Sequence, residues 1–328
     1  MIKKIIRGLL KTVLVLLTVI IVMVAGYIGY FMLFTSNADY SDNMRIVDQT
    51  ELVIVDCDNS MGSFWEVDDG MVIAYLMNKP EANLLGITTT FGNKTYDHKY
   101  TVMMLEKLDR ADTPLYKGEQ QADSETTEAA KFLAEKAAAN PGQITIIAAG
   151  PLGNLKAAYD LDHDFFKNVK EIVIMGGYTE PLILGSREVS ELNLSADYQA
   201  SYEVLYSEAK ITLMTAQACL DAPFYFKDLK NLKNFPLSWK FQNLFWLTLQ
   251  KLGLGNNYYV LWDLLPASYA FNNEYFDNQE VYLNSSLDDL KTGTIIYNTS
   301  GEGKLINMPK GIRETEKFYD DLFLNWNR

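Results

Sequence analysis

The sequence predicts an α/β fold: an open, mostly parallel, Rossmann-like sheet with helices on both faces, preceded by one transmembrane helix. From residue 51 onward, short apolar runs rich in β-branched residues alternate with helical stretches. Repetition of strand, helix and strand builds a parallel sheet that helices cover on both faces. Before that region, residues 12–34 form an unbroken apolar run that is long enough to cross a bilayer as a helix.

The N-terminal run predicts a single-pass anchor. A secretory signal peptide is the alternative, but its apolar region usually spans only about 7 to 15 residues. Residues 1–11 are a basic tail, and no acid precedes Asp39, so the tail is expected in the cytoplasm and the rest outside the cell. Residues 35–50 are expected to form a tether at the cell membrane, and residues 51–328 one extracellular domain.

Composition places this domain among globular proteins and excludes nucleic acid as a partner. The chain is 48% hydrophobic and 22% charged. Four of its 29 basic residues precede the apolar run, which leaves 25 against 42 acidic residues, so binding to phosphates is disfavoured. Cys57 and Cys219 are the only cysteines, and two buried free thiols are expected rather than a disulfide framework.

The elements follow one another in a regular order. Apolar β-prone runs predict strands at 52–55, 84–90, 143–148, 171–177 and 210–215. Helical stretches separate them at 70–78, 97–110, 126–139, 153–161 and 197–208. Residues 223–282 are expected to be mostly helical and are rich in aromatic side chains, which leaves self-association into a homo-oligomer open. The tail from residue 289 is expected to return short strands to the sheet.

Acidic residues gather where the first strand ends. Asp56 and Asp58 flank Cys57 with period-two spacing, so both are expected on one side of the strand. In an open α/β sheet this edge binds ligands, and crowded carboxylates accept a hard cation such as Ca²⁺ or Mg²⁺. A solvated turn is the alternative, because Asp68 and Asp69 also suit the start of the next helix.

These residues resemble the N-terminal signature of the inosine-uridine nucleoside hydrolase family, DxDxGxDD after a first strand. Asp56, Asp58, Asp68 and Asp69 match it, and further matches in family order are 86-GITTTFGN-93, 148-AAGPLGNLKAA-158, 173-VIMGG-177, 191-ELNLSAD-197 and 262-WDLLPASYA-270. The resemblance covers nearly all of the chain beyond the tether. It implies the nucleoside hydrolase fold and cleavage of an N-glycosidic bond by water.

The resemblance also implies roles for individual residues. Ca²⁺ would be held by Asp58, Asp69, Asp263 and the backbone carbonyl of Ala149, with Asp58 as general base for the attacking water. The residues that would bind the ribose are Asp68, Asn93, Glu191 and Asn193, with Met175 against the face of the sugar. Each has a plainer alternative: a cap or loop hydrogen bond for Glu191 and Asn193, a turn for Asn93, and core packing for Met175.

Trp262 is the first departure from most of the family. Many members carry a histidine acid before the late aspartate, whereas here Trp262 precedes Asp263, and neither His98 nor His163 falls in a motif. The segment 258-YYVLWDLLPASYAF-271 resembles the purine-specific inosine-adenosine-guanosine subgroup, whose tryptophan stacks on the base and eases its protonation. Tyr259 in this segment is expected to contact the substrate.

The loop between Asp58 and Asp68 is the second departure from the family pattern. Nine residues, 59-NSMGSFWEV-67, separate Asp58 from Asp68, against three in the family signature. The insertion is a surface bulge, a displacement that abolishes metal binding, or, as we hypothesise, a segment whose Phe64 or Trp65 covers the base. Gly185 replaces an asparagine that contacts the ribose in many relatives.

Two functions are therefore weighed. The first is a membrane-anchored, Ca²⁺-dependent nucleoside hydrolase that acts on purine ribonucleosides outside the cell, as a scavenger would. The alternative is a catalytically inactive surface receptor that binds a nucleoside or sugar on the same fold.

Overall fold

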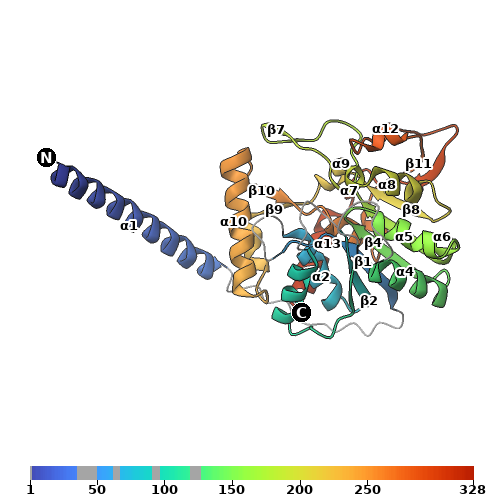
Figure 1. Ribbon diagram of the computed structural model, residues 1–328, viewed down its shortest axis with the longest axis horizontal. Coiled ribbons are helices and arrows are strands. Elements are labelled where there is room, and N and C mark those ends of the chain that lie inside the picture. The colour runs from blue at the N-terminus through green and yellow to red at the C-terminus, as the bar shows by residue number, and fades with distance from the viewer. Residues whose placement is uncertain (1, 35–49, 62–66, 91–96, 119–126) are drawn as a thin grey trace.

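The computed structural model describes residues 2–34, 50–61, 67–90, 97–118 and 127–328, and its fold is α/β with one large sheet (Figure 1). Within these residues the sheet has nine strands in the order β12-β11-β13-β8-β5-β4-β1-β2-β3. The strands are β1 (Glu51–Cys57), β2 (Ala82–Thr89), β3 (Leu115–Lys117), β4 (Ile144–Ala149), β5 (Glu171–Met175), β8 (Ile211–Met214), β11 (Glu280–Leu283), β12 (Tyr297–Asn298) and β13 (Lys304–Asn307).

The sheet is mostly parallel, as the sequence predicts. β1 lies between β2 and β4 and is parallel to both. Among the described strands of this sheet, the antiparallel pairs are those that β11 makes with β12 and with β13. All five predicted strands are present. Because parallel strands end at the same edge, the residues that follow β1, β4, β5 and β8 lie next to one another.

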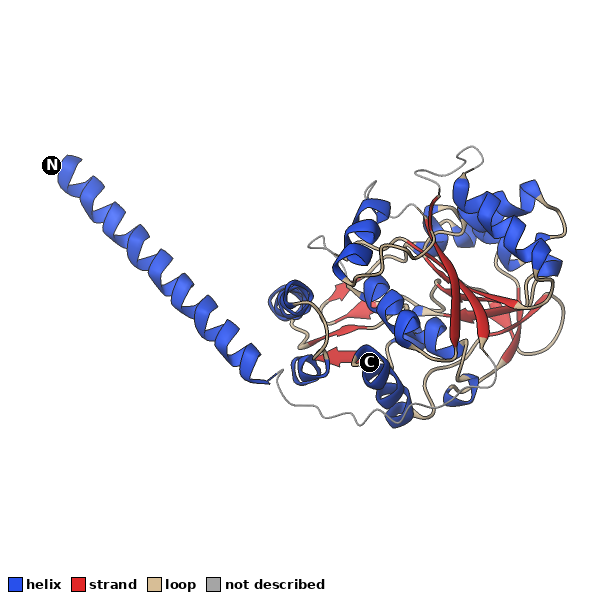
Figure 2. Cartoon of the chain, turned by 90° about the horizontal axis from the view of Figure 1, so that it is seen from below, coloured by secondary structure: helices blue, strands red, loops and turns tan. Residues whose placement is uncertain are grey.

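Helices cover both faces of the sheet (Figure 2). Successive residues of β1 point to opposite faces: Val53 and Val55 join a core with α2 and α11, while Ile54 joins a core with α4 and α5. The longer helices of the domain are α2 (Asp68–Asn78), α3 (Asp97–Lys107), α4 (Glu128–Ala139), α5 (Gly153–Leu161), α8 (Tyr198–Leu205), α10 (Leu237–Leu254) and α13 (Thr315–Trp326). The shorter ones are α6 (Phe165–Asn168), α7 (Asn193–Ala196), α9 (Ala216–Cys219), α11 (Leu264–Tyr269), α12 (Leu287–Leu290), and the 3₁₀ turns η1 (Phe226–Asn231) and η2 (Asn273–Tyr275).

The C-terminal region differs from the expectation. Short strands do return to the sheet as β12 and β13, but the described chain then continues into the helix α13. Phe318, Leu322 and Trp326 recur every four residues on this helix and are all buried, which is the period of an α-helix. Two small antiparallel strand pairs were also missed, because two or three residues are too few to show alternation. They are β6 (Ile183–Leu184) with β7 (Arg187–Glu188), and β9 (Pro223–Tyr225) with β10 (Tyr258–Val260).

The N-terminal helix α1 (Ile2–Phe34) extends away from the domain in both views (Figures 1 and 2). Among the described residues, no helix combines the length and the apolar character that a membrane crossing needs. The transmembrane helix therefore stays a prediction from the sequence. The two cysteines, in contrast, are free and buried, as predicted.

Candidate functional site

A cavity of about 250 Å³ lies at the carboxyl edge of the sheet. Met175 ends β5 and lines the cavity, and Asp58 lines it directly after β1. The pairing of Cys57 with Ala149 places the end of β4 beside the end of β1. The remaining lining residues come from the starts of α2 and α11, from α10 and from residues 182–193.

Three buried carboxylates converge at this cavity. Asp68 and Asp69 begin α2, and Asp263 lies immediately before α11. Each offers an oxygen within 4.8 Å of the others. Burial raises the pKa of Asp68 to about 6, although hydrogen bonds from its own backbone and from Asp263 and Trp262 lower it in part. Such a group resists ionising without a nearby positive charge, so this donor set fits a hard divalent cation.

Asp58 lies in the same cavity but outside that group of three. A Cβ built on Gly150 would approach Asp58 Oδ1 to 3.0 Å, so the carboxylate lies against the backbone that follows Ala149. The structure thus brings Asp58, Asp69 and Asp263 to one cavity, and it adds Asp68, which we expected at the sugar, to the acidic cluster. Ala149 ends β4 beside the end of β1 but is not among the residues that line the cavity.

Asp56 makes hydrogen bonds inside the fold and does not line the cavity. Its carboxylate is fully buried and accepts hydrogen bonds from Thr88 Oγ1 at 2.6 Å and Asn154 Nδ2 at 2.7 Å. Burial raises the pKa of Asp56 to about 7, and these two bonds oppose that rise. Asp56 therefore ties the end of β1 to β2 and α5, and so supports Asp58 two residues later.

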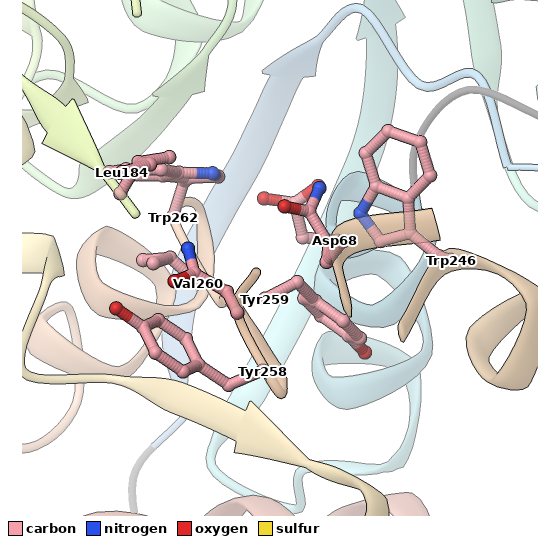
Figure 3. Close-up of a pocket in the computed structure, with 9 residues that line it drawn as sticks. Asp68, Leu184, Trp246, Tyr258, Tyr259, Val260 and Trp262 are labelled. Carbon is pink, nitrogen blue, oxygen red and sulfur yellow. The ribbon is translucent and has the colours of Figure 1, made fainter. Parts of the chain in front are cut away.

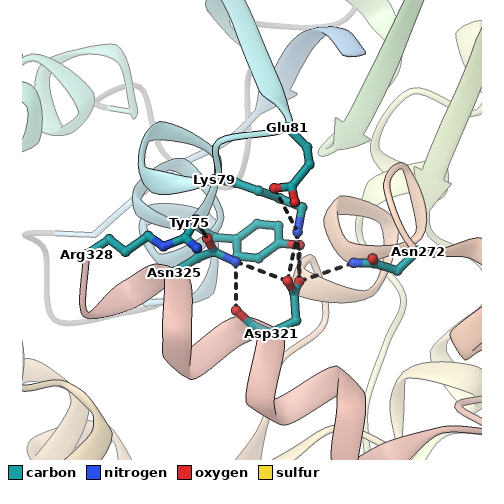
Figure 4. Close-up of polar contacts among 7 residues, drawn as sticks. All are labelled: Tyr75, Lys79, Glu81, Asn272, Asp321, Asn325 and Arg328. Atoms are coloured by element: carbon teal, nitrogen blue, oxygen red, sulfur yellow. Dashed lines mark hydrogen bonds and ion pairs between the residues drawn. The ribbon is translucent and has the colours of Figure 1, made fainter. Parts of the chain in front are cut away.

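Helix α13 holds α2, which carries two of the three clustered acids. Asp321 accepts hydrogen bonds from Tyr75 at 2.5 Å and from Lys79 at 2.8 Å (Figure 4). Trp326 Nε1 donates to the Met71 carbonyl at 3.0 Å. These contacts join the two helices along most of the length of α2.

Glu191 and Asn193 border the cavity but make local bonds. The Glu191 carboxylate accepts backbone N–H groups from Gly177 at 3.1 Å, Leu194 at 2.8 Å and Ser195 at 2.9 Å. Asn193 Nδ2 donates to the Met175 carbonyl at 3.1 Å. Their plainer alternative is therefore observed, and their contact with a ribose stays a prediction.

Two tryptophans line the cavity beside the acidic cluster. Trp262 and Trp246 lie on opposite sides of Asp68 (Figure 3), and both line the main cavity and an adjoining one of about 70 Å³. Tyr259 borders the smaller cavity, but it is buried and its hydroxyl bonds to Asn243. Trp246 and Gln250 of α10 were not singled out from the sequence, although their spacing of four places both on one helix face.

The predictions for Trp65, Asn93 and Gly185 remain to be compared with the structure. Phe64, Trp65 and Asn93 lie outside the described residues, so the hypothesis that Phe64 or Trp65 covers the base stays open. Gly185 has φ +61°, and a Cβ there would meet the Leu254 carbonyl oxygen at 2.1 Å. The chain therefore needs glycine in this turn, and an asparagine would not fit the same backbone.

Comparison with known proteins places the chain in a family. A sequence model of the inosine-uridine preferring nucleoside hydrolases matches residues 53–320. The chain belongs to this family. Its members are metal-dependent hydrolases, and Asp68, Asp69 and Asp263 are the described residues that could together hold an ion here.

Individual nucleoside hydrolases have limited sequence identity to this chain. A probable uridine nucleosidase 2 of Oryza sativa subsp. japonica is 28% identical over 222 residues, which cover 58% of this chain and 64% of that protein. The chain therefore spans less than two thirds of that relative. A plant nucleoside hydrolase has a TM-score of 0.73 at 21% identity, covering 84% of this chain and 98% of its own. A purine-preferring ribonucleoside hydrolase from Gardnerella vaginalis has the same TM-score and coverages at 18% identity. These structural likenesses establish the shared fold.

Proposed function

We propose that this member of the family is a membrane-anchored, Ca²⁺-dependent nucleoside hydrolase that cleaves purine ribonucleosides to free base and ribose. The observation that carries the proposal is the convergence of Asp68, Asp69 and Asp263 at one cavity with Trp262 beside them. These residues are far apart in the chain, and the fold brings them together at one cavity.

The acidic residues have different roles around the sugar. Asp69, Asp263, Asp58 and the Ala149 carbonyl would hold the cation, which would supply Lewis acidity toward water. Asp58 would act as general base for the attacking water. The other carboxylates stabilise the positive charge that develops on the ribose as the base departs.

The tryptophans suit a purine base. Trp262 and Trp246 both line the cavity and lie on opposite sides of Asp68 in Figure 3. A purine offers these side chains a larger aromatic surface than a pyrimidine does. The names of the relatives do not agree on the preferred base: the rice protein is named for uridine and the Gardnerella vaginalis protein for purines. The tryptophan pair is the reason for proposing a purine.

The membrane anchor is proposed from the sequence of α1. Its apolar run has no charge between Lys11 and Asp39, and the four basic residues that precede it favour a cytoplasmic N-terminus. Resistance of the full chain to extraction from membranes by alkaline carbonate tests the anchor. Release by carbonate would leave the hydrolase proposal intact but remove this part.

The activity is tested with the purified full chain, by measuring free base released from inosine, adenosine, guanosine and uridine with calcium or with a chelator. Inosine or another purine nucleoside is expected to be cleaved fastest, and chelation to abolish cleavage. Asp58→Asn is expected to lower kcat by about 10²- to 10⁴-fold, as loss of a general base does.

A matched control and two contrary outcomes make the test decisive. The exposed Asp112→Asn substitution removes the same charge on the surface and is expected to leave turnover unchanged. Faster cleavage of uridine than of any purine nucleoside would overturn the base preference. Calcium-dependent binding of nucleosides without release of base would favour the receptor.

A further inference from the structure

One wall of the main cavity is apolar and comes largely from the strand pair β6 and β7. Leu182 and Leu184 are both buried and line the cavity, while Ile183 between them is 55% exposed, as alternation along a strand requires. Val189 follows β7, donates its backbone N–H to the Leu182 carbonyl at 2.9 Å, and also lines the cavity. We call these three lining residues, together with Leu254 at the end of α10, the apolar wall.

Gly185 joins the two elements that build the apolar wall. A Cβ at this position would lie 2.1 Å from the Leu254 carbonyl oxygen, so the turn between β6 and β7 packs directly on the end of α10. Only a residue without a side chain permits so close an approach at φ +61°. Backbone packing therefore brings Leu184 and Leu254 to the same cavity.

The polar side chains beside the apolar wall are bonded to the backbone of their own loop. The oxygens of Glu191 accept three backbone N–H groups, at 3.1, 2.8 and 2.9 Å, and Oε2 also lies against Gly293, where a Cβ would approach it to 2.2 Å. Asn193 Nδ2 donates to the Met175 carbonyl, and Ser190 is exposed at the cavity. A hydroxyl against the apolar wall would lose water without an equivalent bond from Glu191.

The shape of a ribonucleoside decides which of its groups faces this wall. The base and C5′ project from the two carbons that flank the ring oxygen, whereas the 2′- and 3′-hydroxyls lie on the opposite edge of the ring. The proposed function places those hydroxyls at the acids around Asp68 and the base at Trp246 and Trp262. C5′ is then left to face the remaining part of the lining, which includes the apolar wall.

We infer that the cavity takes purine nucleosides whose C5′ carries an apolar group, such as a methylthio group, in place of the hydroxyl. The inference rests on the proposed function and narrows its substrate class. Burial of such a group against the apolar wall is favourable, whereas burial of an unpaired hydroxyl is costly. The reaction itself is unchanged: the bond from C1′ to the base nitrogen breaks, water supplies a hydroxyl to C1′ and a proton to the base, and the 5′ group takes no part.

The test compares adenosine, 5′-deoxyadenosine and 5′-methylthioadenosine, which share one base and the same 2′,3′-diol. Binding to the full chain carrying Asp58→Asn is measured by titration calorimetry with calcium, and release of adenine by the wild type is measured in parallel. The Kd of 5′-methylthioadenosine is expected to be about tenfold lower than that of adenosine, with 5′-deoxyadenosine between them. A weaker metal site in the variant lowers all three affinities alike, so the ratio is preserved.

Two substitutions on the strand pair assign the preference to the apolar wall. Val189→Thr places a hydroxyl on the wall at nearly constant shape, and it is expected to remove most of the preference for the methylthio group. Ile183→Thr makes a comparable change at an exposed side chain that does not line the cavity, and it is expected to keep the preference. The ratio of two Kd values is the readout, because a general disturbance of the fold weakens both.

The outcomes separate this inference from the proposed function. Release of adenine from adenosine, with adenosine bound as tightly as 5′-methylthioadenosine or more so, would overturn the inference and leave the hydrolase standing. Preferred binding of 5′-methylthioadenosine without release of adenine would support the inference and favour the receptor. A preference that Val189→Thr keeps, or that Ile183→Thr loses equally, would overturn the assignment to the apolar wall. Failure of all three nucleosides to bind or to be cleaved would overturn both.

Discussion

At the residue scale, the position of Asp58 depends on Gly150. A Cβ at Gly150 would meet Thr90 Cγ2 at 2.7 Å and Asp58 Oδ1 at 3.0 Å, so any side chain there pushes the carboxylate away. Gly150→Ala is therefore expected to lower kcat more than tenfold with a folded protein. Circular dichroism and kinetics with a purine nucleoside measure the two effects.

The control for that substitution is Gly253→Ala. Nothing lies within 4 Å of a Cβ at Gly253, which is inside α10. Alanine there is expected to stabilise the helix by up to about 1 kcal/mol and to leave turnover unchanged. Wild-type activity of Gly150→Ala would mean that Asp58 does not act from its observed position.

Trp246 is the second prediction at this scale. Trp246→Ala is expected to raise KM for purine nucleosides about tenfold, because stacking contributes on the order of 1 kcal/mol beyond the loss of buried area. Trp246→Phe should recover most of the affinity. Steady-state kinetics in detergent measure both.

Phe245→Ala is the matched control for Trp246. Phe245 is the preceding residue on the same helix, but it is 42% exposed on the outer face. Its loss is expected to leave KM unchanged in detergent. An equal rise in KM for both variants would indicate a general disturbance of α10 rather than a contact with the base.

At the element scale, the Asp321 network fixes α2 against α13. Lys79 is almost completely buried at the end of α2, and its ammonium group faces Asp321 (Figure 4). Asp321→Asn leaves this cation without its nearest partner, and breaking a buried pair in this way costs about 3 kcal/mol. The midpoint of urea unfolding is expected to fall accordingly.

The same variant tests how α2 positions its acids. Because Asp68 and Asp69 begin α2, loosening the helix is expected to weaken calcium binding as well as stability. Asp160→Asn, which removes a partly exposed ion pair with Lys156, is the control and should change neither. Loss of stability with unchanged calcium affinity would show that α13 only supports the fold.

At the scale of the whole molecule, a bound cation would join α2 to α11. Asp68 and Asp69 belong to the former and Asp263 precedes the latter, so binding is available only to the folded chain. At a calcium concentration of 100 times Kd this adds about 2.7 kcal/mol, which raises Tm by on the order of 5 °C. Thermal unfolding with calcium and with a chelator measures the difference.

Asp263→Asn supplies the comparison for that measurement. It removes one charge from the cluster, so its Tm is expected to respond little to calcium. A wild-type Tm that calcium does not change would contradict the metal site, whatever the kinetics. A variant that responds as the wild type does would exclude Asp263 as a ligand.

Much of the fold was predictable because its signals are local. Apolar runs such as 143–148 and helical stretches such as 153–161 show their period within a few residues, and their order dictates a parallel sheet. The pairs β6 with β7 and β9 with β10 are too short to carry a period. The short strands expected after residue 289 are present as β12 and β13, whereas helix α13, whose period shows in Phe318, Leu322 and Trp326, was not singled out.

The candidate site was predictable in part. The carboxyl edge of the sheet and Asp58 at the end of β1 follow from the alternation of strands and helices. Ala149 was expected near Asp58 only from the family resemblance, and the pairing of β1 with β4 places it there. The local bonds of Glu191 and the inward direction of Trp246 do not, because they depend on how a loop and a long helix pack against other elements.

The sequence by itself determined the layered α/β architecture, the edge at which ligands gather and the abundance of acid there, since periodicity and chain order act over short distances. Only the tertiary structure decided which acids share one centre, bringing Asp263 to Asp68 and Asp69, and that Trp246 lines the same cavity as Trp262. The physical reason is that contacts between distant segments depend on the packing of whole helices. No local pattern in a chain records that packing.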